Sequence, residues 1–190
     1  MMERFCAKHL YSIDPELSNE VLDVIESYTD SLEYENSRLV SGINSDRRKS
    51  KNAWIDPNNW ISAIAYNAII NANLQYFNYD IGNIWESVQV TVYNEDHSHY
   101  EWHCDNVDVR EVQSIPTERK LSCSFLLSDP DDYDGGELQF NLSHNKFFKS
   151  VKPKRGIIYV FPSWIPHRVR PVTRGVRKSI VAWMSGPLFK

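Results

Sequence analysis

Apolar side chains recur at helical spacing in two segments near the N-terminus. Asp14 is a typical N-cap residue and Pro15 suits a first helical position, so the first segment predicts a helix over residues 15–30. The second segment predicts a helix over about residues 57–76, because its apolar residues also repeat every three or four positions. The two apolar faces consist of Leu17, Val21, Leu22, Ile25 and Tyr28, and of Trp60, Ile61, Ile64, Ala65, Ala68, Ile69 and Ala72.

After the second helix the pattern changes to short segments rich in β-branched and aromatic residues, separated by turn-forming clusters. Two helices followed by about eight strands predict a mainly β fold with flanking helices. We expect a double-stranded β-helix, or jelly roll, with the N-terminal helices packed on one sheet. The predicted strands are 86–94, 100–105, 119–128, 136–142, 147–152, 156–161, 166–172 and 176–184.

The chain length fits one domain. Its 190 residues can bury a sizeable core, and neither a linker nor an internal repeat divides them. We expect a single domain over 1–190, with about 1–80 as helical support and about 86–186 as the jelly-roll core. Residues 41–52, between the predicted helices, are polar and have no apolar period, which predicts a mobile loop.

Several predicted strands carry a partly polar row of side chains. In the first strand, the valines occupy one face, and Gln89, Thr91 and Tyr93 occupy the other. In a later strand, Ser122 and Ser124 share a face in the same way. If these rows face solvent, the fold is a plain sandwich; if they face inward, the sheets enclose a polar pocket that suits a ligand. Periodicity alone leaves both arrangements open.

Composition and charge narrow the class of protein. With 42% hydrophobic and 24% charged residues, the chain as a whole is globular, not disordered, collagenous or coiled-coil. The net charge is only −4, but all 25 acidic residues lie within residues 1–137, whereas residues 138–190 hold 11 of the 21 basic residues. A basic segment of this kind can contact nucleic acid, an acidic partner or an anionic cofactor.

Cysteine usage and hydropathy indicate a compartment. The three cysteines, Cys6, Cys104 and Cys123, form no CxxC pair, which argues against a disulfide framework and a structural zinc cage. The N-terminal residues lack the apolar region of a signal peptide, and no run approaches the ~20 apolar residues that a membrane span needs. We therefore expect a cytoplasmic protein with no membrane partner.

One pair of residues has the spacing of metal ligands. His103 and Asp105 are two residues apart, so they share a face of an extended strand. His167 lies in apolar surroundings and is the best candidate for a third ligand. Two imidazoles and one carboxylate leave open positions on a metal, as in non-haem Fe(II) oxygenases. An isolated pair of this kind is common by chance, however, and most such pairs bind nothing.

Two other metal sites fit less well. A zinc site would have to use ligands crowded into one short segment without a matching second pair. The acidic run 129–137 fails the spacing of a calcium-binding loop and is better explained as a solvated turn. The residues of the zinc alternative are His97, His99, His103 and Cys104.

Taken together, several spacings resemble the prolyl-4-hydroxylase-type 2-oxoglutarate/Fe(II) dioxygenases, in particular the bacterial and phage PKHD-type hydroxylases. An arginine follows the distal histidine by ten residues, and a tryptophan follows six residues later. The resemblance is strong over about residues 86–186, and the segment Arg48-Lys49-Ser50 with Trp54 is similar to the superfamily's substrate-side loop. The residues that carry it are Tyr93, Tyr100, His103, Asp105, the turn 129–138, His167, Arg177 and Trp183.

The resemblance implies a cofactor and a co-substrate site. Fe(II) would be held by His103, Asp105 and His167. The distal carboxylate of 2-oxoglutarate would bind Arg177, whose guanidinium can donate two parallel charge-assisted hydrogen bonds. The family often uses L-ascorbate as an accessory reductant, so ascorbate is a further candidate.

The same resemblance implies that the polar rows face inward. It gives Tyr93 and Ser179 contacts to 2-oxoglutarate, and either Ser122 or Ser124 completes that site. Arg168 and Arg170 are expected to point away from the site, and Arg174 to pair with an acidic neighbour. The substrate-pocket candidates are Tyr100, Trp183 and Arg48.

The implied reaction is hydroxylation of a substrate C–H, with release of succinate and CO2. A prolyl or other residue in a protein or peptide is the first expectation for the substrate, with the 41–51 loop as a lid. Alternatives are a free amino acid or small metabolite, a nucleic acid, a non-catalytic jelly roll that binds 2-oxoglutarate, and a structural jelly roll. The pI of about 5.9 argues against nucleic acid. The sequence leaves the oligomeric state open.

Among the basic residues of the C-terminal segment, only Arg177 has a functional role in this assignment, and the segment also holds His167, the distal iron ligand. The other bases, including those of the predicted hairpin 146–155, are expected to face acidic residues of the first 137 positions, because a jelly roll interleaves early and late strands.

Overall fold

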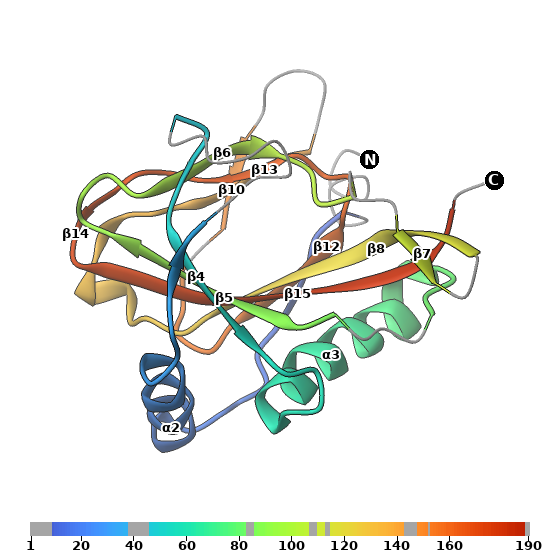
Figure 1. The fold of residues 1–190 in the computed structure, drawn as a ribbon, viewed down its shortest axis with the longest axis horizontal. Coiled ribbons are helices and arrows are strands. Elements are labelled where there is room, and N and C mark those ends of the chain that lie inside the picture. The colour runs from blue at the N-terminus through green and yellow to red at the C-terminus, as the bar shows by residue number, and fades with distance from the viewer. Residues whose placement is uncertain are drawn as a thin grey trace.

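The computed structural model describes residues 9–37, 46–82, 86–106, 110–112, 115–142, 148–151 and 153–188. Two sheets face each other, and two helices lie on the outer side of the larger sheet (Figure 1). The elements are β1 (Tyr11–Ile13), α2 (Asn19–Asp30), β2 (Glu35–Asn36), β3 (Arg48–Lys49), β4 (Lys51–Ile55), α3 (Trp60–Ala72), a π-helical turn (Asn73–Phe77), β5 (Val88–Asn94), β6 (His99–His103), β7 (Arg110–Val112), β8 (Ile115–Leu126), a 3-10 turn (Pro130–Asp132), β9 (Asp134–Gly135), β10 (Leu138–Asn141), β11 (Phe148–Ser150), β12 (Ile158–Pro162), β13 (His167–Val169), β14 (Val172–Arg174) and β15 (Val176–Pro187).

Strands from distant parts of the chain are neighbours in both sheets. The larger sheet has the order β1-β12-β8-β15-β5-β4-β2, with β7 paired to β8, and the smaller sheet has the order β11-β10-β13-β6-β3. Strands β9 and β14 form a separate short pair, and the pairings are antiparallel. The prediction of a mainly β fold with helices on one sheet is confirmed.

Helix α3 lies against the larger sheet through an apolar face. Ile61, Ala65 and Ile69 are fully buried, and they belong to the same core cluster as Val88 and Val90 of β5. The valine row of β5 therefore faces the helices, as its alternation predicts. The other row of β5 faces the smaller sheet, so the polar rows point into the space between the sheets.

Basic residues of the C-terminal segment attach α2 to the rest of the molecule. The Lys178 ammonium contacts the Asp30 carboxylate and lies 3.7 Å from Glu26 Oε1. Arg155 Nη2 donates hydrogen bonds of 2.7 Å to both Asp23 and Glu26. These pairs bear out the expectation that late basic residues face early acidic ones.

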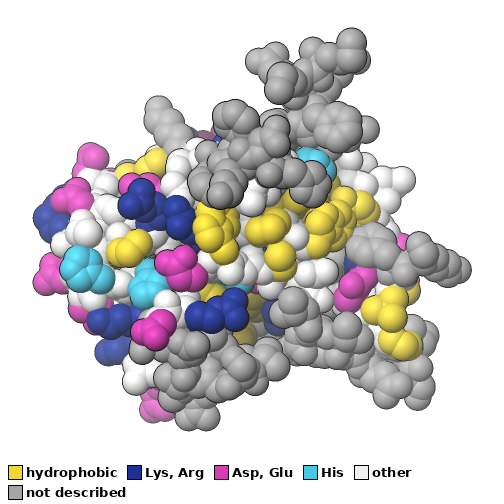
Figure 2. Space-filling view, turned by 90° about the horizontal axis from the view of Figure 1, so that it is seen from above, with side chains coloured by type: hydrophobic (Ala, Val, Ile, Leu, Met, Phe, Trp, Pro, Cys, Tyr) yellow, Lys and Arg dark blue, Asp and Glu magenta, His cyan; other side chains and the backbone are white. Residues whose placement is uncertain are grey.

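The same mixing of charge is visible on the surface. Arg174 pairs with Asp134 at 2.7 Å, and Lys154 contacts Asp14. On the outer face of the smaller sheet, acidic and basic side chains are interspersed at the end where β14 lies (Figure 2). Lys146 and Lys152 of the predicted basic hairpin lie outside the described residues.

The predicted start of the first helix is wrong. The helix begins at Asn19, and Ser18 is its N-cap, with a side chain that accepts a hydrogen bond from the Val21 N–H. Asp14 instead accepts a hydrogen bond from the N–H of Glu16, whose φ of 52° is incompatible with a right-handed helix. A turn that uses an Asx side chain thus occupies the place of the expected first helical turn.

The prediction that residues 41–52 form a mobile loop is also wrong for those of its residues that the structure describes. Residues 38–45 lie outside the described residues, but Arg48–Lys49 and Lys51–Ile55 form strands. β3 pairs with β6 in the smaller sheet, and β4 pairs with β5 in the larger one. This segment has no apolar period because Arg48 and Asn52 line the space between the sheets and bond to one another, while Lys49 and Lys51 are exposed.

None of the helices that the structure describes has the length and apolar character needed to cross a membrane.

Substitutions at two neighbouring residues of α2 test how this helix packs. Ile25 is fully buried, whereas Val24 is 58% exposed. We predict that Ile25→Ala lowers the free energy of unfolding by about 2–5 kcal/mol, because it leaves a cavity in a packed core. Val24→Ala is the matched control and should change it by less than about 0.5 kcal/mol. Urea denaturation measures both values, and equal effects would contradict this packing.

Candidate metal centre and its pocket

A cavity of about 560 Å³ lies between the two sheets. Its rim includes the exposed residues Glu33, Glu35, Asn36 and Trp54, and its walls come from both sheets. Ten of the residues that the sequence singles out as site candidates line it, and Ser122, the alternative to Ser124, does not. The ten are Arg48, Tyr93, Tyr100, His103, Asp105, Ser124, His167, Arg177, Ser179 and Trp183.

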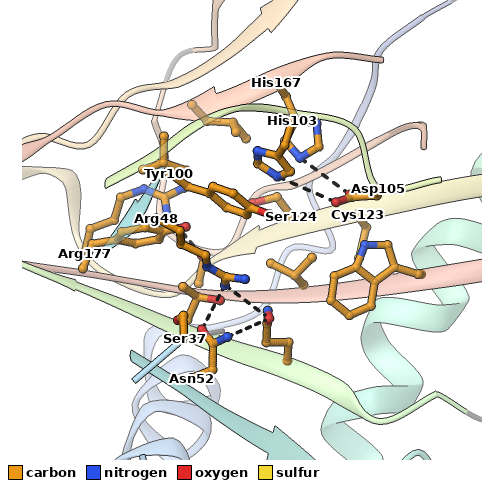
Figure 3. Close-up of a pocket in the computed structure, with 18 of the residues that line it drawn as sticks. Ser37, Arg48, Asn52, Tyr100, His103, Asp105, Cys123, Ser124, His167 and Arg177 are labelled. Carbon is orange, nitrogen blue, oxygen red and sulfur yellow. Dashed lines mark hydrogen bonds and ion pairs between the residues drawn. The ribbon is translucent and has the colours of Figure 1, made fainter. Parts of the chain in front are cut away.

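Strand pairing brings the candidate metal ligands together. In the β6–β13 pair, His103 is directly opposite His167. Asp105 follows just after β6, where its N–H donates a 2.8 Å hydrogen bond to the Ser163 carbonyl. The Nε2 atoms of His103 and His167 lie 3.7 and 3.6 Å from the Asp105 carboxylate oxygens. One potential ligand atom from each residue lies within 4.8 Å of the others, a spacing that suits one shared metal ion (Figure 3).

The backbone orients both imidazoles. His103 Nδ1 lies 2.8 Å from the Glu101 carbonyl oxygen, and His167 Nδ1 lies 3.0 Å from the Ile165 carbonyl oxygen. Because a carbonyl can only accept, each Nδ1 carries a proton, and in a neutral imidazole Nε2 is then the nitrogen with the lone pair. This is the tautomer that a metal requires when it binds through Nε2.

Electrostatics favour the ligand forms of His103 and Asp105. Burial and the neighbouring His167 lower the pKa of His103 to about 3, so its imidazole is neutral at physiological pH. Burial alone would raise the pKa of Asp105, but His167, His103, the Arg119 guanidinium and the Ser122 hydroxyl hold that pKa below its usual range. The site therefore combines the neutral imidazole of His103 with the carboxylate anion of Asp105, and His167 places a second imidazole beside them.

Ser122 bonds one of the candidate metal ligands. Its hydroxyl donates a 2.8 Å hydrogen bond to Asp105 Oδ2 and lies 2.9 Å from the Ser163 hydroxyl. Ser124, two residues further along β8, lines the cavity instead. Of the two serines between which the sequence leaves the choice open, Ser124 is thus the one on the cavity wall.

Aromatic rings fix the histidines from the side. Tyr100 stacks on His103 with ring centroids 3.4 Å apart, and Phe161 meets His167 edge-on at 4.7 Å. These contacts restrict rotation of both imidazoles, as preorganised ligands require.

The opposite side of the cavity is cationic. Arg177, on β15 and opposite Tyr93 of β5, is only 3% exposed (Figure 3). Its Nη1 donates a 3.1 Å hydrogen bond to the Ser179 hydroxyl, and Tyr133 lies beside it in the lining of an adjoining cavity. Within the described part of the chain, no carboxylate lies within ion-pair distance of this guanidinium. A buried cation without a counter-ion is costly, so this end of the cavity favours an anionic ligand.

Two neighbours of Arg177 have no clear signal in the sequence. Gly136 makes room for the aliphatic part of the Arg177 side chain and for the Tyr133 ring: a Cβ on Gly136 would lie 2.9 Å from Arg177 Cδ and 3.3 Å from Tyr133 Cε2. Gly136 also has a φ of 65°, which favours glycine. Local pattern predicts only a turn at these positions, because the contact is made across the fold.

Arg48 is fixed on the cavity wall. Its guanidinium donates to Asn52 Oδ1 at 3.0 Å and to Gln89 Oε1 at 3.3 Å, and it lies 4.5 Å from the centre of the Tyr100 ring. Three strands therefore hold it at one place between the rim and the candidate metal ligands. The sequence predicts that Arg48 lies on a mobile loop, whereas in the structure it lies on strand β3 with fixed contacts.

Two buried polar atoms on the cavity wall have no hydrogen-bond partner in the described part of the chain: Trp183 Nε1 and Thr91 Oγ1. Buried donors and acceptors are normally satisfied, so both atoms are candidates for contact with a ligand or water. Arg119 lies 3.9 Å from the Trp183 ring and supports it from one side.

Residues expected to lie outside the site do so. Arg174 pairs with Asp134, and Arg168 bonds Gln139 on the outer face of the smaller sheet. His97 is exposed, and His99 bonds backbone carbonyls, so neither joins the metal cluster of the described residues. The zinc alternative therefore receives no support. Cys104 and Cys123 are free thiols, and Cys6 lies outside the described residues.

Known proteins are similar to this chain in sequence. The sequence of residues 88–185 matches the 2OG-Fe(II) oxygenase superfamily. Over 177 residues the chain is 27% identical to the PKHD-type hydroxylase YbiX of Escherichia coli, and the alignment covers 92% of this chain and 77% of that protein.

Solved structures share the fold. A prolyl hydroxylase from Trichoplax adhaerens, in complex with a hypoxia inducible factor peptide fragment, aligns with a TM-score of 0.71 at 19% identity, over 96% of this chain and 86% of that chain. A prolyl-4-hydroxylase from Pseudomonas putida aligns with a TM-score of 0.70 at 20% identity, over 96% and 95%. The donor set of His103, Asp105 and His167 fits the iron that this family uses. With a match that runs from β5 into β15, the chain belongs to the 2OG-Fe(II) oxygenase superfamily, whose enzymes use Fe(II), 2-oxoglutarate and dioxygen.

Proposed function

We propose that the protein is a 2-oxoglutarate-dependent hydroxylase that acts on a prolyl or other residue of a protein or peptide. His103, Asp105 and His167 hold Fe(II) in this proposal, and Arg177 binds the distal carboxylate of 2-oxoglutarate. The two facing sheets are the two halves of a jelly roll. The observation that carries the proposal is the presence of an iron-type donor set and a buried, counter-ion-free guanidinium on one cavity.

Bound Fe(II) supplies the redox chemistry by which dioxygen converts 2-oxoglutarate to succinate and CO2 and a substrate C–H to C–OH. The chain supplies position and a shielded site. Arg177 and Ser179 orient the co-substrate through its distal carboxylate, and the Tyr93 hydroxyl, buried beside Arg177, and Ser124 are its further candidate contacts. Burial of these groups strengthens the ion pair with a carboxylate, because water cannot screen it.

The substrate side supports a large partner. The rim of the cavity is exposed on β2 and β4, and Trp54 there is 55% exposed. The Trichoplax adhaerens relative of similar fold was solved with a peptide fragment. We assign Arg48, Tyr100 and Trp183 to the substrate side, since they line the wall between that rim and the candidate iron ligands. Use of ascorbate as an accessory reductant stays a prediction.

The first test of this proposal is spectroscopic. Under anaerobic conditions, Fe(II) and 2-oxoglutarate together should give a visible charge-transfer band in the wild-type protein, because a 2-oxo acid bound to Fe(II) absorbs in that range. His103→Ala and Asp105→Ala should abolish the band, while His99→Ala should retain it, since His99 lies outside the metal cluster. A wild-type protein without a band, or a band that survives both ligand variants, contradicts the proposal.

The second test concerns Arg177. Arg177→Gln should weaken 2-oxoglutarate binding by about 30-fold or more, because truncating one partner of a buried charge pair costs about 2 kcal/mol or more. Iron content should stay at the wild-type level, since Arg177 is not a ligand. Titration of the charge-transfer band gives the affinity, and metal analysis gives the iron content. Arg174→Gln, which removes an exposed arginine paired with Asp134, is the control and should bind normally. Equal affinities for the two variants would reject Arg177 as the anchor.

The third test concerns the substrate. Incubation of the iron-loaded enzyme with proline-containing peptides and with a protein extract should give peptides heavier by one oxygen atom, detected by mass spectrometry. Asp105→Ala is the control and should give none. Oxygen added to free amino acids but to no peptide would favour the small-metabolite alternative.

A further inference from the structure

A second cavity of about 210 Å³ adjoins the first at its cationic end. Three residues, Ser124, Leu138 and Arg177, line both cavities. These side chains therefore separate the two cavities where they adjoin, and one of the three is Arg177, the candidate anchor of the co-substrate. A water molecule occupies about 30 Å³ in the liquid, so the second cavity has room for a small organic acid.

The second cavity has its own rim. Along β8, the inward row runs from Ser124, which lines both cavities, to Leu126, which lines only the second. Glu137 and Pro153 line it and are exposed, so it reaches the surface. The rim of the main cavity, at Asn36 and Trp54 of β2 and β4, is formed by other elements of the fold.

The lining of the second cavity suits a short carboxylic acid. Leu126, Leu138 and Val151 supply apolar walls, and Tyr133 and Arg177 supply a hydroxyl and a cation at its inner end. Arg177 Nη1 already donates a 3.1 Å hydrogen bond to the Ser179 hydroxyl, so an anion that arrives finds an oriented guanidinium.

Acidic residues at this rim are already paired. Asp134 lies 2.7 Å from Arg174, and the Glu137 carboxylate lies 3.9 Å from Arg170. Because each carboxylate has an arginine beside it, neither presents an unbalanced negative charge to an approaching dianion.

We propose that this second cavity is the passage by which the dicarboxylate co-substrate enters and the dicarboxylate product leaves. The inference rests on the proposed function, since it takes 2-oxoglutarate and succinate as the ligands of Arg177. A protein substrate seated on the rim at Asn36 and Trp54 covers the main opening. A separate passage behind Arg177 allows succinate and 2-oxoglutarate to exchange while that substrate stays bound.

The test is kinetic and uses one tryptophan at each opening. Anaerobic stopped-flow recording of the Fe(II)–2-oxoglutarate band gives the association rate, and a chase with excess succinate gives the release rate. Pro153→Trp narrows the second opening, Asn36→Trp narrows the main rim, and Pro187→Trp places the same substitution at an exposed position that lines neither cavity.

We expect Pro153→Trp to slow association and release equally, by about tenfold each, because a narrowed passage raises the barrier without changing either end state. The dissociation constant then stays at the wild-type value. Asn36→Trp and Pro187→Trp should leave both rates unchanged. Glu137→Trp, on the same rim, repeats the test if Pro153→Trp fails to fold by circular dichroism.

Three results overturn the passage. These are unchanged rates in both second-rim variants, slowing by Asn36→Trp alone, and weaker binding without slower association. A wild-type protein with no band at all rejects the proposed function instead, so the two failures are distinguishable.

Discussion

The antiparallel pairing of β6 with β13 is the constraint on which the site depends. It sets His103 opposite His167, and it brings Asp105 to the same point at the end of β6. Side chains alternate between the faces of a strand, so a slip of one residue in this register would turn one imidazole out of the cavity. The rest of the smaller sheet and the aromatic contacts to both histidines maintain this register and the ring orientations.

Desolvation explains why the two ends of the cavity differ. Near the candidate metal ligands, the buried Asp105 carboxylate lies beside two imidazoles, and a metal cation completes the charge balance. At the other end, Arg177 is buried with the Ser179 hydroxyl as a partner and with no described carboxylate within ion-pair distance, so an anion completes the balance there. A molecule that binds a metal at one end and presents a carboxylate at the other satisfies both requirements. 2-Oxoglutarate has this form.

Much of this organisation is encoded in local patterns. The alternation of valines with Gln89, Thr91 and Tyr93 predicts which face of β5 meets the helices, because one face of this strand lies in the apolar core. The spacing of His103 and Asp105 indicates a candidate pair of metal ligands, but it was the resemblance to a family that joined His167 to them in one predicted centre. The direction of the polar rows could not be obtained from periodicity alone and depended on resemblance to a family.

Other features depend on contacts that local patterns do not contain. The helix start was misplaced because the Asp14 side chain bonds Glu16 in a turn, a competitor to N-capping. The strands at Arg48 and Asn52 were missed because their partners are polar groups on other strands. Likewise, only the assembled fold shows that Ser122 bonds Asp105 and that Gly136 makes room for Arg177.

The most direct measurement is diffraction from crystals grown anaerobically with Fe(II) and 2-oxoglutarate, with anomalous scattering recorded at the iron edge. The account predicts one iron peak bonded to His103 Nε2, His167 Nε2 and the Asp105 carboxylate. It also predicts the distal carboxylate of 2-oxoglutarate within hydrogen-bonding distance of Arg177. An iron peak on other residues, or a carboxylate placed away from Arg177 with the iron in place, would contradict it.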